Sequence, residues 1–483
     1  MAEKEKLNIL FVSSEVVPFA KTGGLADVSS ALPKALTKLG CNVKVIMPKY
    51  SKIDEVKYDL KFVCDLPNGG AIKKSKLRGS SVEFYFVEYE HYFGRNGLYG
   101  ENGSDYSDNA ERFIFFSKCV LDFARFSGFQ PDIIHCNDWQ TALIPVYISS
   151  LRTDPFFKNT ATVLTVHNMA YQGIFSKQTM YATGLSWDYF TRDKLEYWDQ
   201  INFMKGGLVF ADIINTVSET YAKEIQSGYD YGWGLEGILQ NRKDDLFGIL
   251  NGIDAKVWSP EADKYLTKKY GLLTIGKKLE NKKLLAEKCG LPFKPGTPLL
   301  GMVSRFADQK GFDIIGPAMD ILMKSDVQFI IQGIGDQRCN DMFAAFQKKY
   351  PEKFAVVLRF DERIAHLIYA GADMFLMPSR FEPCGLSQLI SFKYGTVPVV
   401  RETGGLADSV INYEPKNGKG TGFVFKDYSP WAMLDAVKRA VTVYQNKKSW
   451  VKLIIKDMEL DFSWDKSAEK YVELYNKALL KRR

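Results

Sequence analysis

Short apolar runs alternate with amphipathic stretches along most of the chain, and each run ends at a polar loop. The first run, NILFV at 8–12, precedes a KTGG loop, apolar residues at helical spacing from Leu25 to Leu39, and a second run at 41–48. This order predicts a strand, a loop, a helix and a strand, which together make a βαβ unit. Pro33 argues against a regular helix there, although not against the helix itself.

Two series of further runs have the character of buried strands, because they are apolar on both faces. The first series lies at 132–138, 162–168 and 213–218, and the second at 299–306, 327–336, 355–360, 373–381 and 397–405, with a helix near 311–324. Strands of this kind are covered by helices and pair in parallel. We therefore predict an α/β protein of two doubly wound, Rossmann-like parallel-sheet domains that face each other across a deep cleft. Ligands are expected at the carboxyl ends of the strands.

The length of 483 residues also favours two domains. The Gly-, Pro- and Asp-containing segment 251–263 is the natural linker. We predict an N-terminal domain over 1–250, a C-terminal domain over 251–458, and a final helix within 459–483 that packs back on the N-terminal domain. The apolar face of that helix is predicted from Ala468, Tyr471, Val472, Tyr475 and Leu479.

Composition excludes several classes of protein. The net charge of +7 is spread without a long Lys/Arg block, so nucleic-acid binding is not expected. Seven scattered cysteines without a CxxC pair argue for a reducing compartment and against a disulfide framework or a structural zinc site. We found no uninterrupted apolar stretch of about 18 residues and no signal or transit pattern, so we expect a cytoplasmic protein that is not bound to a membrane.

The hexapeptide TGGLAD occurs twice, at 22–27 and at 403–408. Each copy lies between a predicted strand and a predicted helix, where main-chain N–H groups and the helix dipole attract anions. The copies differ in the preceding residue, which is Lys21 in the first and Glu402 in the second. We interpret the repeat as a glycine loop at the ligand-binding edge of each domain.

Seven motifs together carry a resemblance to a known family. They are KTGGLADV, HCNDWQTAL, TVHNMAYQG, LNGIDAKVWSP, SRFADQKGFD, SRFEPCGLSQL and RETGGLADS. In this order, over about residues 8–465, the chain resembles bacterial glycogen synthases and plant starch synthases. The resemblance implies a GT-B glycosyltransferase that moves glucose from a nucleotide-glucose to the non-reducing end of an α-1,4-glucan, with retention of anomeric configuration. It favours ADP-glucose as donor, with UDP-glucose as the alternative, and implies neither a cofactor nor a metal.

Three charged residues are predicted to do the chemistry on the donor side. Arg305 and Lys310 follow a predicted strand, and by themselves such a pair is more often part of a solvated loop. With the resemblance, they are interpreted as a clamp for the diphosphate of the sugar nucleotide, which gains negative charge as the glycosidic bond breaks. The sequence offers no DxD-type pair at a strand end to hold a metal instead. Glu382 by itself fits equally a helix-start acid that complements the dipole. The resemblance implies that it contacts the glucose and stabilises positive charge at the anomeric carbon.

The resemblance and the loop positions imply further donor contacts. The amides of Cys384, Gly385 and Leu386 would bind sugar hydroxyls, and the loop of Thr403, Gly404 and Gly405 would bind the phosphates. Gly333 and Gly335 would leave room for the nucleotide, and Phe360 and Tyr369 are candidates for stacking on the base.

In the N-terminal domain, polar residues at predicted strand ends are expected beside the reacting sugar. The resemblance implies that His167 and Asn168 lie there, that Asp138 accepts a hydrogen bond from a glucose hydroxyl, and that Asn251 reaches the same sugar. A lone His is more often a core residue, and an Asn-Gly pair has a simple turn-forming explanation.

The first glycine loop supplies the remaining candidates. Lys21 is placed to reach the distal phosphate, and Gly23 and Gly24 allow the loop to approach a ligand. Asp27 is expected at an interface or on the acceptor side. Tyr99 and Asp105, in a glycine-rich stretch, are candidates for acceptor contacts.

Three other classes of protein remain to be separated from this interpretation. A nicotinamide-dependent oxidoreductase needs GxGxxG after its first strand, whereas this chain has KTGGLAD. A glucan phosphorylase shares the architecture but requires pyridoxal phosphate. A non-catalytic glucan-binding or regulatory protein is disfavoured by the joint presence of Lys21, Arg305, Lys310 and Glu382. The sequence does not indicate an oligomeric state.

Overall fold

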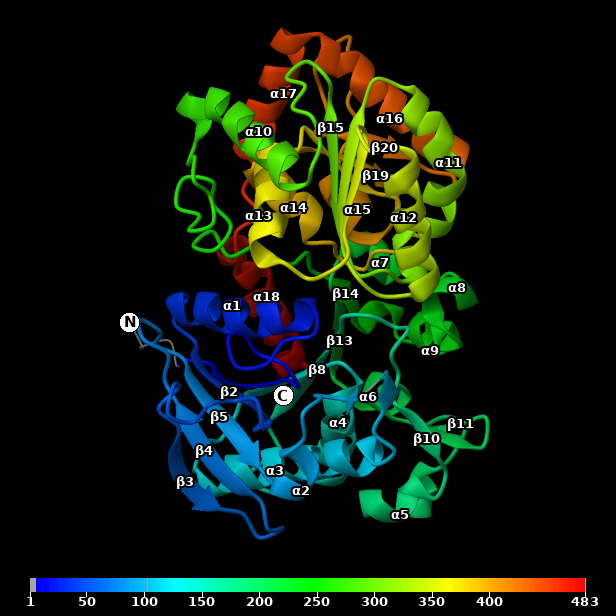
Figure 1. Ribbon diagram of the computed structural model, residues 1–483. Coiled ribbons are helices and arrows are strands. Elements are labelled where there is room, and N and C mark those ends of the chain that lie inside the picture. Colours follow the sequence, from blue (N-terminus) through cyan, green and yellow to red (C-terminus); the bar gives the residue numbers. More distant parts are fainter. Residues whose placement is uncertain (1–5, 102, 483) are drawn as a thin grey trace. The chain divides into compact units, whose positions relative to one another are not determined.

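The structure is a computed structural model that describes residues 6–101 and 103–482, and it divides into two compact units. Unit 1 comprises Met1–Asn251 and Trp464–Arg483, and unit 2 comprises Gly252–Ser463. Asn251 thus belongs to unit 1 and residues 459–463 to unit 2, whereas the predicted boundaries lay before Asn251 and after residue 458. Figure 1 colours the chain from blue at the N-terminus to red at the C-terminus.

In the described part of unit 1, nine strands form one sheet. In spatial order they are β14 (Leu246–Gly248), β13 (Ile213–Thr216), β9 (Ala161–Val166), β8 (Ile133–Asn137), β1 (Asn8–Val12), β2 (Asn42–Pro48), β5 (Glu83–Glu88), β4 (Ala71–Ser75) and β3 (Lys61–Asp65). The strands from β14 to β5 pair in parallel. The central strands β1, β8 and β9 are almost fully buried, which explains their apolar runs.

Strands β4 and β3 continue this sheet in antiparallel pairing and were not predicted. Residues of β3 are exposed or half-buried throughout, so the strand lacks the apolar run by which the central strands were recognised. A separate antiparallel sheet, also not predicted, contains β10 (Ile174–Ser176), β12 (Gln200–Asn202) and β11 (Glu196–Tyr197). A short hairpin pairs β6 (Gly100–Glu101) with β7 (Ser104–Asp105).

Unit 1 contains the first nine α-helices of the described chain and the last. They are α1 (Gly24–Lys38), α2 (Glu90–Phe93), α3 (Asn109–Phe126), α4 (Leu143–Ser150), α5 (Thr179–Thr183), α6 (Phe203–Phe210), α7 (Glu219–Glu224), α8 (Tyr229–Gly232), α9 (Glu236–Asn241) and α18 (Trp464–Leu480). Helix α1 runs continuously through Pro33.

Helix α18, red in Figure 1, packs beside α1 and against the strands β8, β9 and β13. Its buried face includes Ala468, Tyr471 and Tyr475. The Tyr475 hydroxyl lies 2.8 Å from Nδ1 of His135 in β8, and the Tyr471 hydroxyl lies 3.0 Å from the Asn215 amide in β13. The end of the chain is therefore part of the core of unit 1.

His135 is predicted to make unit 1 sensitive to acid. Burial, with a smaller contribution from the charge on His167, lowers the pKa of His135 to about 3. Below the unfolded pKa of about 6.5 the unfolded chain binds a proton that the folded chain does not, so stability falls as pH drops. We expect His135→Gln to flatten this dependence by about one proton, or about 1.4 kcal/mol per pH unit between pH 6 and 4.

The measurement is urea unfolding between pH 7 and pH 4, with the unfolding of unit 1 monitored by hydrogen exchange of its amides. His91→Gln is the control, because His91 is exposed on α2. A His135→Gln protein with the pH dependence of the unsubstituted protein would contradict this prediction.

In the described part of unit 2, six strands form a fully parallel sheet. In spatial order they are β17 (Phe354–Val357), β16 (Gln328–Gln332), β15 (Leu299–Val303), β18 (Met374–Met377), β19 (Val397–Arg401) and β20 (Phe423–Phe425). The order reverses direction between β15 and β18, because β16 and β17 extend to one side and β19 and β20 to the other. A doubly wound sheet binds its ligands at the carboxyl ends of strands beside such a reversal.

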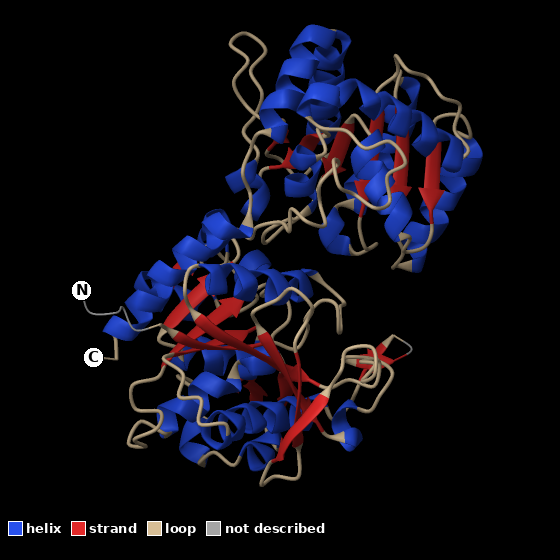
Figure 2. Cartoon of the chain, turned by 90° about the vertical axis from the view of Figure 1, so that its left-hand side faces the viewer, coloured by secondary structure: helices blue, strands red, loops and turns tan. Residues whose placement is uncertain are grey.

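Helices lie on both faces of this sheet (Figure 2). They are α10 (Lys278–Lys288), α11 (Phe312–Lys324), α12 (Gln337–Lys349), α13 (Glu362–Gly371), α14 (Ser387–Lys393), α15 (Gly404–Ser409), α16 (Pro430–Gln445) and α17 (Lys447–Met458). Local sequence explains several starts. At α16 the Ser429 hydroxyl accepts the N–H of Ala432, and Pro430 occupies the first helical position. None of the helices in the described ranges is both long and apolar enough to cross a membrane.

Candidate active site

Two of the predicted catalytic residues meet in unit 2, beside the reversal of strand order. Lys310 follows β15 and Glu382 follows β18. The Lys310 Nζ lies 2.7 Å and 3.0 Å from the two Glu382 carboxylate oxygens, and the Ser379 hydroxyl donates to Oε2 at 2.9 Å. Glu382 is only 6% exposed. Lys310 therefore compensates a buried carboxylate, in addition to any contact with phosphate.

Arg305 lies at the end of the same strand as Lys310 and differs from it in its side-chain contacts. The guanidinium is exposed and makes no ion pair or hydrogen bond with any residue that the structure describes, whereas the Arg305 main-chain oxygen accepts from the Ser304 hydroxyl at 3.1 Å. A fully charged guanidinium in this state is available to an anionic ligand and offers it a bidentate fork. Arg305 is thus the uncommitted cation at the edge where Glu382 and Lys310 are paired.

Gly333 and Gly335 follow β16 and have a packing role. A Cβ at Gly333 would overlap the carbonyl oxygen of Ser304, and one at Gly335 the main chain of Phe306. Phe306 and Gly335 form a parallel bridge, in which Phe306 N–H donates to Ile334 O at 3.0 Å. The two glycines bring the loop after β16 against the segment that carries Arg305. We predicted them for the room they leave to the nucleotide, but the structure gives this closer reason.

The second TGGLAD loop packs directly on the loop that carries Glu382. The amide of Gly405 donates to Glu382 O at 3.0 Å and to Pro383 O at 3.2 Å. Gly404 has a φ of +44°, and a Cβ there would overlap Glu382 O. The Gly405 amide is therefore occupied, which is a correction to its predicted role as a phosphate donor. The glycines at 404 and 405 fix the position of Glu382 instead. Thr403, the N-cap of α15, is buried at the same edge.

The turn after Glu382 keeps two amides available. Among the described residues, no acceptor is found for the N–H groups of Gly385 and Leu386. The side chain of Gln388 holds this turn, because its Nε2 donates to the carbonyl oxygens of Cys384 at 3.0 Å and Gly385 at 2.8 Å. Cys384 is buried. Gln388 was not predicted, although it stands in the motif SRFEPCGLSQL.

The two aromatic candidates for base stacking differ in accessibility. Phe360 lies in the loop after β17 and is 77% exposed. Tyr369 is buried in α13, where it stacks on Phe375 at a centroid distance of 4.9 Å and donates to the Ser387 hydroxyl. The prediction for Tyr369 is therefore wrong, because its ring is already packed in the core. Phe360 keeps an accessible face.

In unit 1 the first TGGLAD loop is held by Glu15, which sequence reasoning missed. Its buried carboxylate accepts the amides of Thr22 at 2.5 Å and Gly23 at 3.1 Å, and the Tyr99 hydroxyl at 2.7 Å. The signal was the SSE that ends the first apolar run. These contacts occupy the Gly23 amide, and they make Tyr99 part of the support for Glu15. Tyr99 was predicted as an acceptor contact.

Lys21 and Asp27 form an ion pair at 2.8 Å on the exposed side of this loop. Half of the Lys21 side chain is exposed, so the pair holds the ammonium group without burying it. Gly24 begins α1, and Asp27 lies one turn further along. Asp27 was predicted for an interface or acceptor contact. In the structure it pairs with Lys21, and such exposed pairs contribute little to stability.

His167 and Asp138 lie together at the ends of β9 and β8. The amide of His167 donates to Asp138 Oδ1 at 2.7 Å, and its Nε2 lies 2.9 Å from Asn137 Oδ1. Because the Asn137 amide nitrogen donates to Val12 O, its oxygen is the acceptor, so His167 carries its proton on Nε2. Burial lowers the pKa of His167 to about 3, so the ring is neutral at pH 7 and Nδ1 is an acceptor.

Asp138 has a strained backbone. Its φ is +57° and its ψ is −176°, a region in which glycine is nearly the only residue observed. Burial raises the pKa of its carboxyl to about 7, against the lowering effect of hydrogen bonds from the amides of His167 and Asn168. Strain of this kind persists where the side chain has a task. The conformation thus marks Asp138 independently of its sequence motif.

The strain predicts an inverted order of stability at this position. Both Asp138→Gly and Asp138→Ala remove the carboxylate, but only glycine adopts this φ and ψ without strain. We expect the free energy of unfolding of the Gly variant to exceed that of the Ala variant by about 1–3 kcal/mol. Thermal unfolding of the two variants measures the difference. Equal stability, or a more stable Ala variant, would contradict the prediction.

Two amide side chains complete the candidates of unit 1. The Asn168 side-chain oxygen accepts the N–H of Ala170 at 3.0 Å, a local turn that leaves its NH₂ group for a ligand. Asn251 is 5% exposed, and its Oδ1 finds no donor among the described residues. A buried acceptor without a partner is costly unless a ligand satisfies it. This supports the predicted role of Asn251.

Over residues 6–101 and 103–482, we find no cluster of three or more His, Cys, Asp or Glu side chains that is arranged to hold a metal ion.

Comparisons with known proteins cover nearly the whole chain. Residues 8–241 match the family model described as starch synthase catalytic domain, and residues 285–456 match glycosyl transferases group 1. The chain is 48% identical to a glycogen synthase of Syntrophotalea carbinolica over 98% of this chain and 99% of that protein. It is 45% identical to a glycogen synthase of Thermotoga maritima, again over 98% and 99% of the two chains.

The fold is similar to that of a solved structure. The catalytic domain of starch synthase IV from Arabidopsis thaliana, bound to ADP and acarbose, has a TM-score of 0.90 and 32% identity, with 99% of this chain and 100% of that chain covered. A sucrose-phosphate synthase from Thermosynechococcus elongatus, 18% identical with a TM-score of 0.61, shares the fold alone. Two doubly wound units, the paired Glu382 and Lys310, and these matches lead to one conclusion. The chain is a glycosyltransferase that belongs to the glycogen synthase and starch synthase family.

Proposed function

We propose that this enzyme transfers glucose from ADP-glucose to the non-reducing end of an α-1,4-glucan, with retention of anomeric configuration and without a metal or cofactor. The observation that carries the proposal is the set of charges at the carboxyl ends of β15 and β18. There, the exposed Arg305 lies at the end of β15, and the ion pair between the half-buried Lys310 and the buried Glu382 connects the two strand ends.

Unit 2 is proposed to bind the donor. Arg305 and Lys310 meet the diphosphate, the amides of Gly385 and Leu386 bind glucose hydroxyls, and Phe360 stacks on the base. The adenine nucleotide is supported by the relative from Arabidopsis thaliana, whose structure holds ADP. Phosphate charge in a site with preorganised cations is stabilised by several kcal/mol more than in water.

The reaction is proposed to proceed on one face of the sugar. The bond between the anomeric carbon and the β-phosphate oxygen breaks, and its electron pair leaves with ADP. The acceptor hydroxyl oxygen bonds to the anomeric carbon from the same face, and its proton passes to the departing phosphate oxygen. Glu382 stabilises the positive charge that develops on the glucose, while Arg305 and Lys310 stabilise the negative charge on ADP.

Unit 1 is proposed to contribute neutral and cationic groups to the same reaction. The neutral His167 offers Nδ1 as an acceptor to a sugar hydroxyl, since its Nε2–H is held by Asn137. Asp138, Asn168 and Asn251 contact the transferred glucose. Lys21 contacts the distal phosphate and is kept in place by Asp27.

A donor panel tests the proposal. The purified protein is incubated with glycogen and radiolabelled ADP-, UDP- or GDP-glucose, with and without EDTA. We expect incorporation that is highest with ADP-glucose, unaffected by EDTA, and released by an α-1,4-specific amylase. Highest incorporation from UDP-glucose would refute the donor, and loss with EDTA would refute metal independence. No incorporation from any donor would point to a non-catalytic glucan-binding protein.

A further inference from the structure

Arg112 in α3 is a fully buried cation that the proposed reaction does not use. It is 0% exposed, and it forms no ion pair with any residue that the structure describes. Its Nε donates to the carbonyl oxygen of Tyr92 at 2.8 Å and its Nη1 to Asn109 Oδ1 at 2.7 Å, whereas Nη2 has no partner among the described residues. Holding a charge out of water without a contacting counter-ion is costly. The reason for its presence therefore has to lie in what surrounds it.

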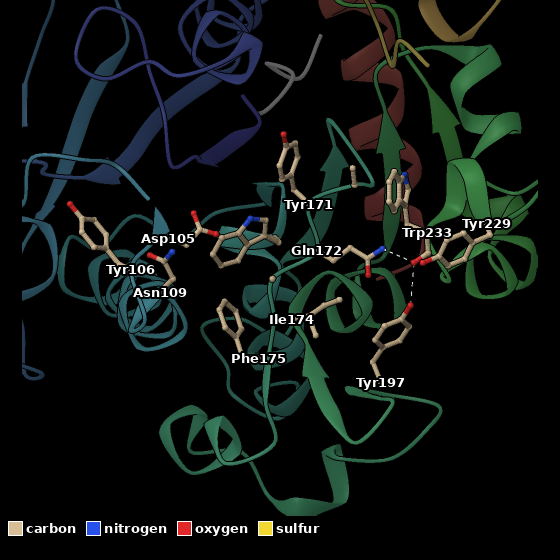
Figure 3. A pocket seen from close by; sticks show the side chains of 13 residues that line it. Asp105, Tyr106, Asn109, Tyr171, Gln172, Ile174, Phe175, Tyr197, Tyr229 and Trp233 are labelled. Carbon is tan, nitrogen blue, oxygen red and sulfur yellow. Dashed lines mark hydrogen bonds between the residues drawn. The ribbon is translucent and has the colours of Figure 1, made fainter. Parts of the chain in front are cut away.

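The guanidinium group of Arg112 organises the start of α3 and the segment before it. Its central carbon lies 4.9 Å from the ring centroid of Tyr106 and 5.5 Å from those of Phe93 and Phe113, which are cation–π distances. Asn109, the first residue of α3, is oriented by its hydrogen bond with Arg112. Figure 3 shows Asn109 and Tyr106 in the lining of a pocket of about 420 Å³. Arg112 holds both of these side chains from the buried side.

Asn109 connects Arg112 to Tyr99 and, through Tyr99, to Glu15. Its Nδ2 donates to the main-chain oxygen of Tyr99 at 2.8 Å, and the same oxygen accepts the amide of Tyr106 at 2.9 Å. At the other end of Tyr99, the hydroxyl donates to Glu15 Oε1 at 2.7 Å. Because its main chain and its hydroxyl are both fixed, Tyr99 is held against Glu15.

Glu15 carries this connection to the loop of Lys21. Its carboxylate accepts the amide of Thr22 at 2.5 Å and that of Gly23 at 3.1 Å, and Thr22 follows Lys21 directly in the chain. Only 4% of Glu15 is exposed, so its negative charge is nearly as deeply buried as the positive charge of Arg112. Two buried charges of opposite sign in one network depend on each other, because each lowers the cost of burying the other.

Tyr50 indicates that the two charges act on the same region. Burial raises the pKa of its phenol, the charge of Arg112 opposes this rise, and the charge of Glu15 adds to it. The Tyr50 ring is fully buried and its centroid lies 6.0 Å from that of Phe93, the ring that also faces the guanidinium group. Arg112 therefore compensates the charge of Glu15 across this buried region, in addition to the hydrogen bonds that connect them.

We propose that Arg112 is a positioning residue for the Lys21 loop, because it fixes Tyr99 through Asn109 and balances the buried charge of Glu15, which holds the loop. The inference rests on the proposed contact between Lys21 and the distal phosphate of the donor. Without Arg112 the loop is still part of the fold, but its main chain is held less firmly at Glu15. A smaller fraction of the protein then presents Lys21 in place, and the affinity for the donor falls.

The test is a double-mutant cycle of Arg112→Gln and Lys21→Met, measured by calorimetric titration with ADP. We expect each single variant to bind ADP about 10-fold more weakly, since each loses a charge-assisted contact or its support. The double variant is expected to bind no more weakly than Lys21→Met alone, because Arg112 acts through the loop. Hydrogen exchange of the peptide 14–28, measured without ADP, is expected to become about 10-fold faster in Arg112→Gln.

Two further variants make the test specific. Asn109→Leu keeps the cation and cuts its connection to Tyr99, so it is expected to reproduce both effects and replaces Arg112→Gln in the cycle if that variant does not fold. Arg95→Gln is the matched control. Arg95 also lies 4.9 Å from the Tyr106 ring centroid, but it pairs with Asp108 at 2.6 Å and has no hydrogen bond to Asn109. This variant is expected to keep the ADP affinity and the exchange rate of the unsubstituted protein.

Additive losses in the cycle would overturn the inference, because a general structural defect weakens binding equally with and without Lys21. Unchanged exchange of the peptide 14–28 in Arg112→Gln and Asn109→Leu, or an equal change in Arg95→Gln, would overturn it as well. If Lys21→Met binds ADP as tightly as the unsubstituted protein while Arg112→Gln still accelerates the exchange, the proposed phosphate contact of Lys21 fails and the positioning of the loop stands.

Discussion

Replacement of Glu382 by Gln is expected to lower kcat by about 10³-fold, with little change in the affinity for ADP. The carboxylate is buried and paired with Lys310 at 2.7 Å, so its negative charge is held in place before the sugar arrives. Gln keeps the size and the hydrogen bond to Ser379 but removes the charge that opposes the developing cation. Steady-state kinetics and calorimetric titration with ADP measure the two effects. Glu352→Gln, at an exposed position before the amino end of β17, is the control.

Two further variants, Lys310→Met and the double variant Lys310→Met with Glu382→Gln, test the pairing itself. The single change leaves the Glu382 carboxylate buried without its cation, which weakens ADP binding and lowers the rate together. Since the two residues act as one unit, we expect the double variant to be no worse than the poorer single variant. A Glu382→Gln enzyme that keeps more than a tenth of kcat, or strictly additive losses, would contradict this interpretation.

Replacement of Lys278 by Met is expected to lower the free energy of unfolding of unit 2 by about 3 kcal/mol. The buried ammonium group donates to the carbonyl oxygens of Ala370 at 3.0 Å and Tyr394 at 3.1 Å, and to the Thr396 hydroxyl at 2.7 Å. It thereby satisfies carbonyl groups at the ends of α13 and α14. Met has a similar shape but donates no hydrogen bond, so the two carbonyl oxygens keep only the Tyr270 hydroxyl, at 2.8 Å from Tyr394 O and 3.3 Å from Ala370 O.

The pH dependence separates Lys278 from other causes of destabilisation. Burial lowers its pKa from about 10.5 to about 7. Between these values the unfolded chain binds a proton that the folded chain lacks, so stability gains from Lys278 as pH rises from 7 to 10. Urea unfolding at pH 7, 8.5 and 10 is expected to show this slope in the unsubstituted protein and its loss in Lys278→Met. Lys283→Met, exposed on the same helix, is the control, and an equal loss there would contradict the assignment.

The two copies of TGGLAD show how far a local motif predicts a site. Both copies begin a helix after a parallel strand, as their sequence indicates. Different amides find partners in the two copies. In the first copy the first glycine, Gly23, donates to the carboxylate of Glu15, and in the second copy the second glycine, Gly405, donates to the main-chain oxygen of Glu382. Neither acceptor lies within its own copy of the motif, so no pattern in the six residues distinguishes the two cases.

The sequence by itself determined the buried parallel strands of both units and the edge at which the chemistry lies. Apolar runs that end in polar loops reflect burial on both faces, which is a local property of each segment, and parallel strands bring their carboxyl ends to one edge. Arg305, Glu382 and His167 stand at the ends of such runs, and the resemblance to the family was needed to assign them roles in the site.

Only the tertiary structure decided which of these groups are paired, which are free and which merely support the others. Lys310 meets Glu382 across 72 residues, Tyr99 meets Glu15 across 84, and Tyr475 meets His135 across 340. The small antiparallel sheet of β10, β12 and β11 likewise contains no apolar run from which the sequence could predict it. Such contacts depend on how whole strands and helices pack, because a side chain acquires its partner, its burial and its pKa from segments that the local sequence does not contain.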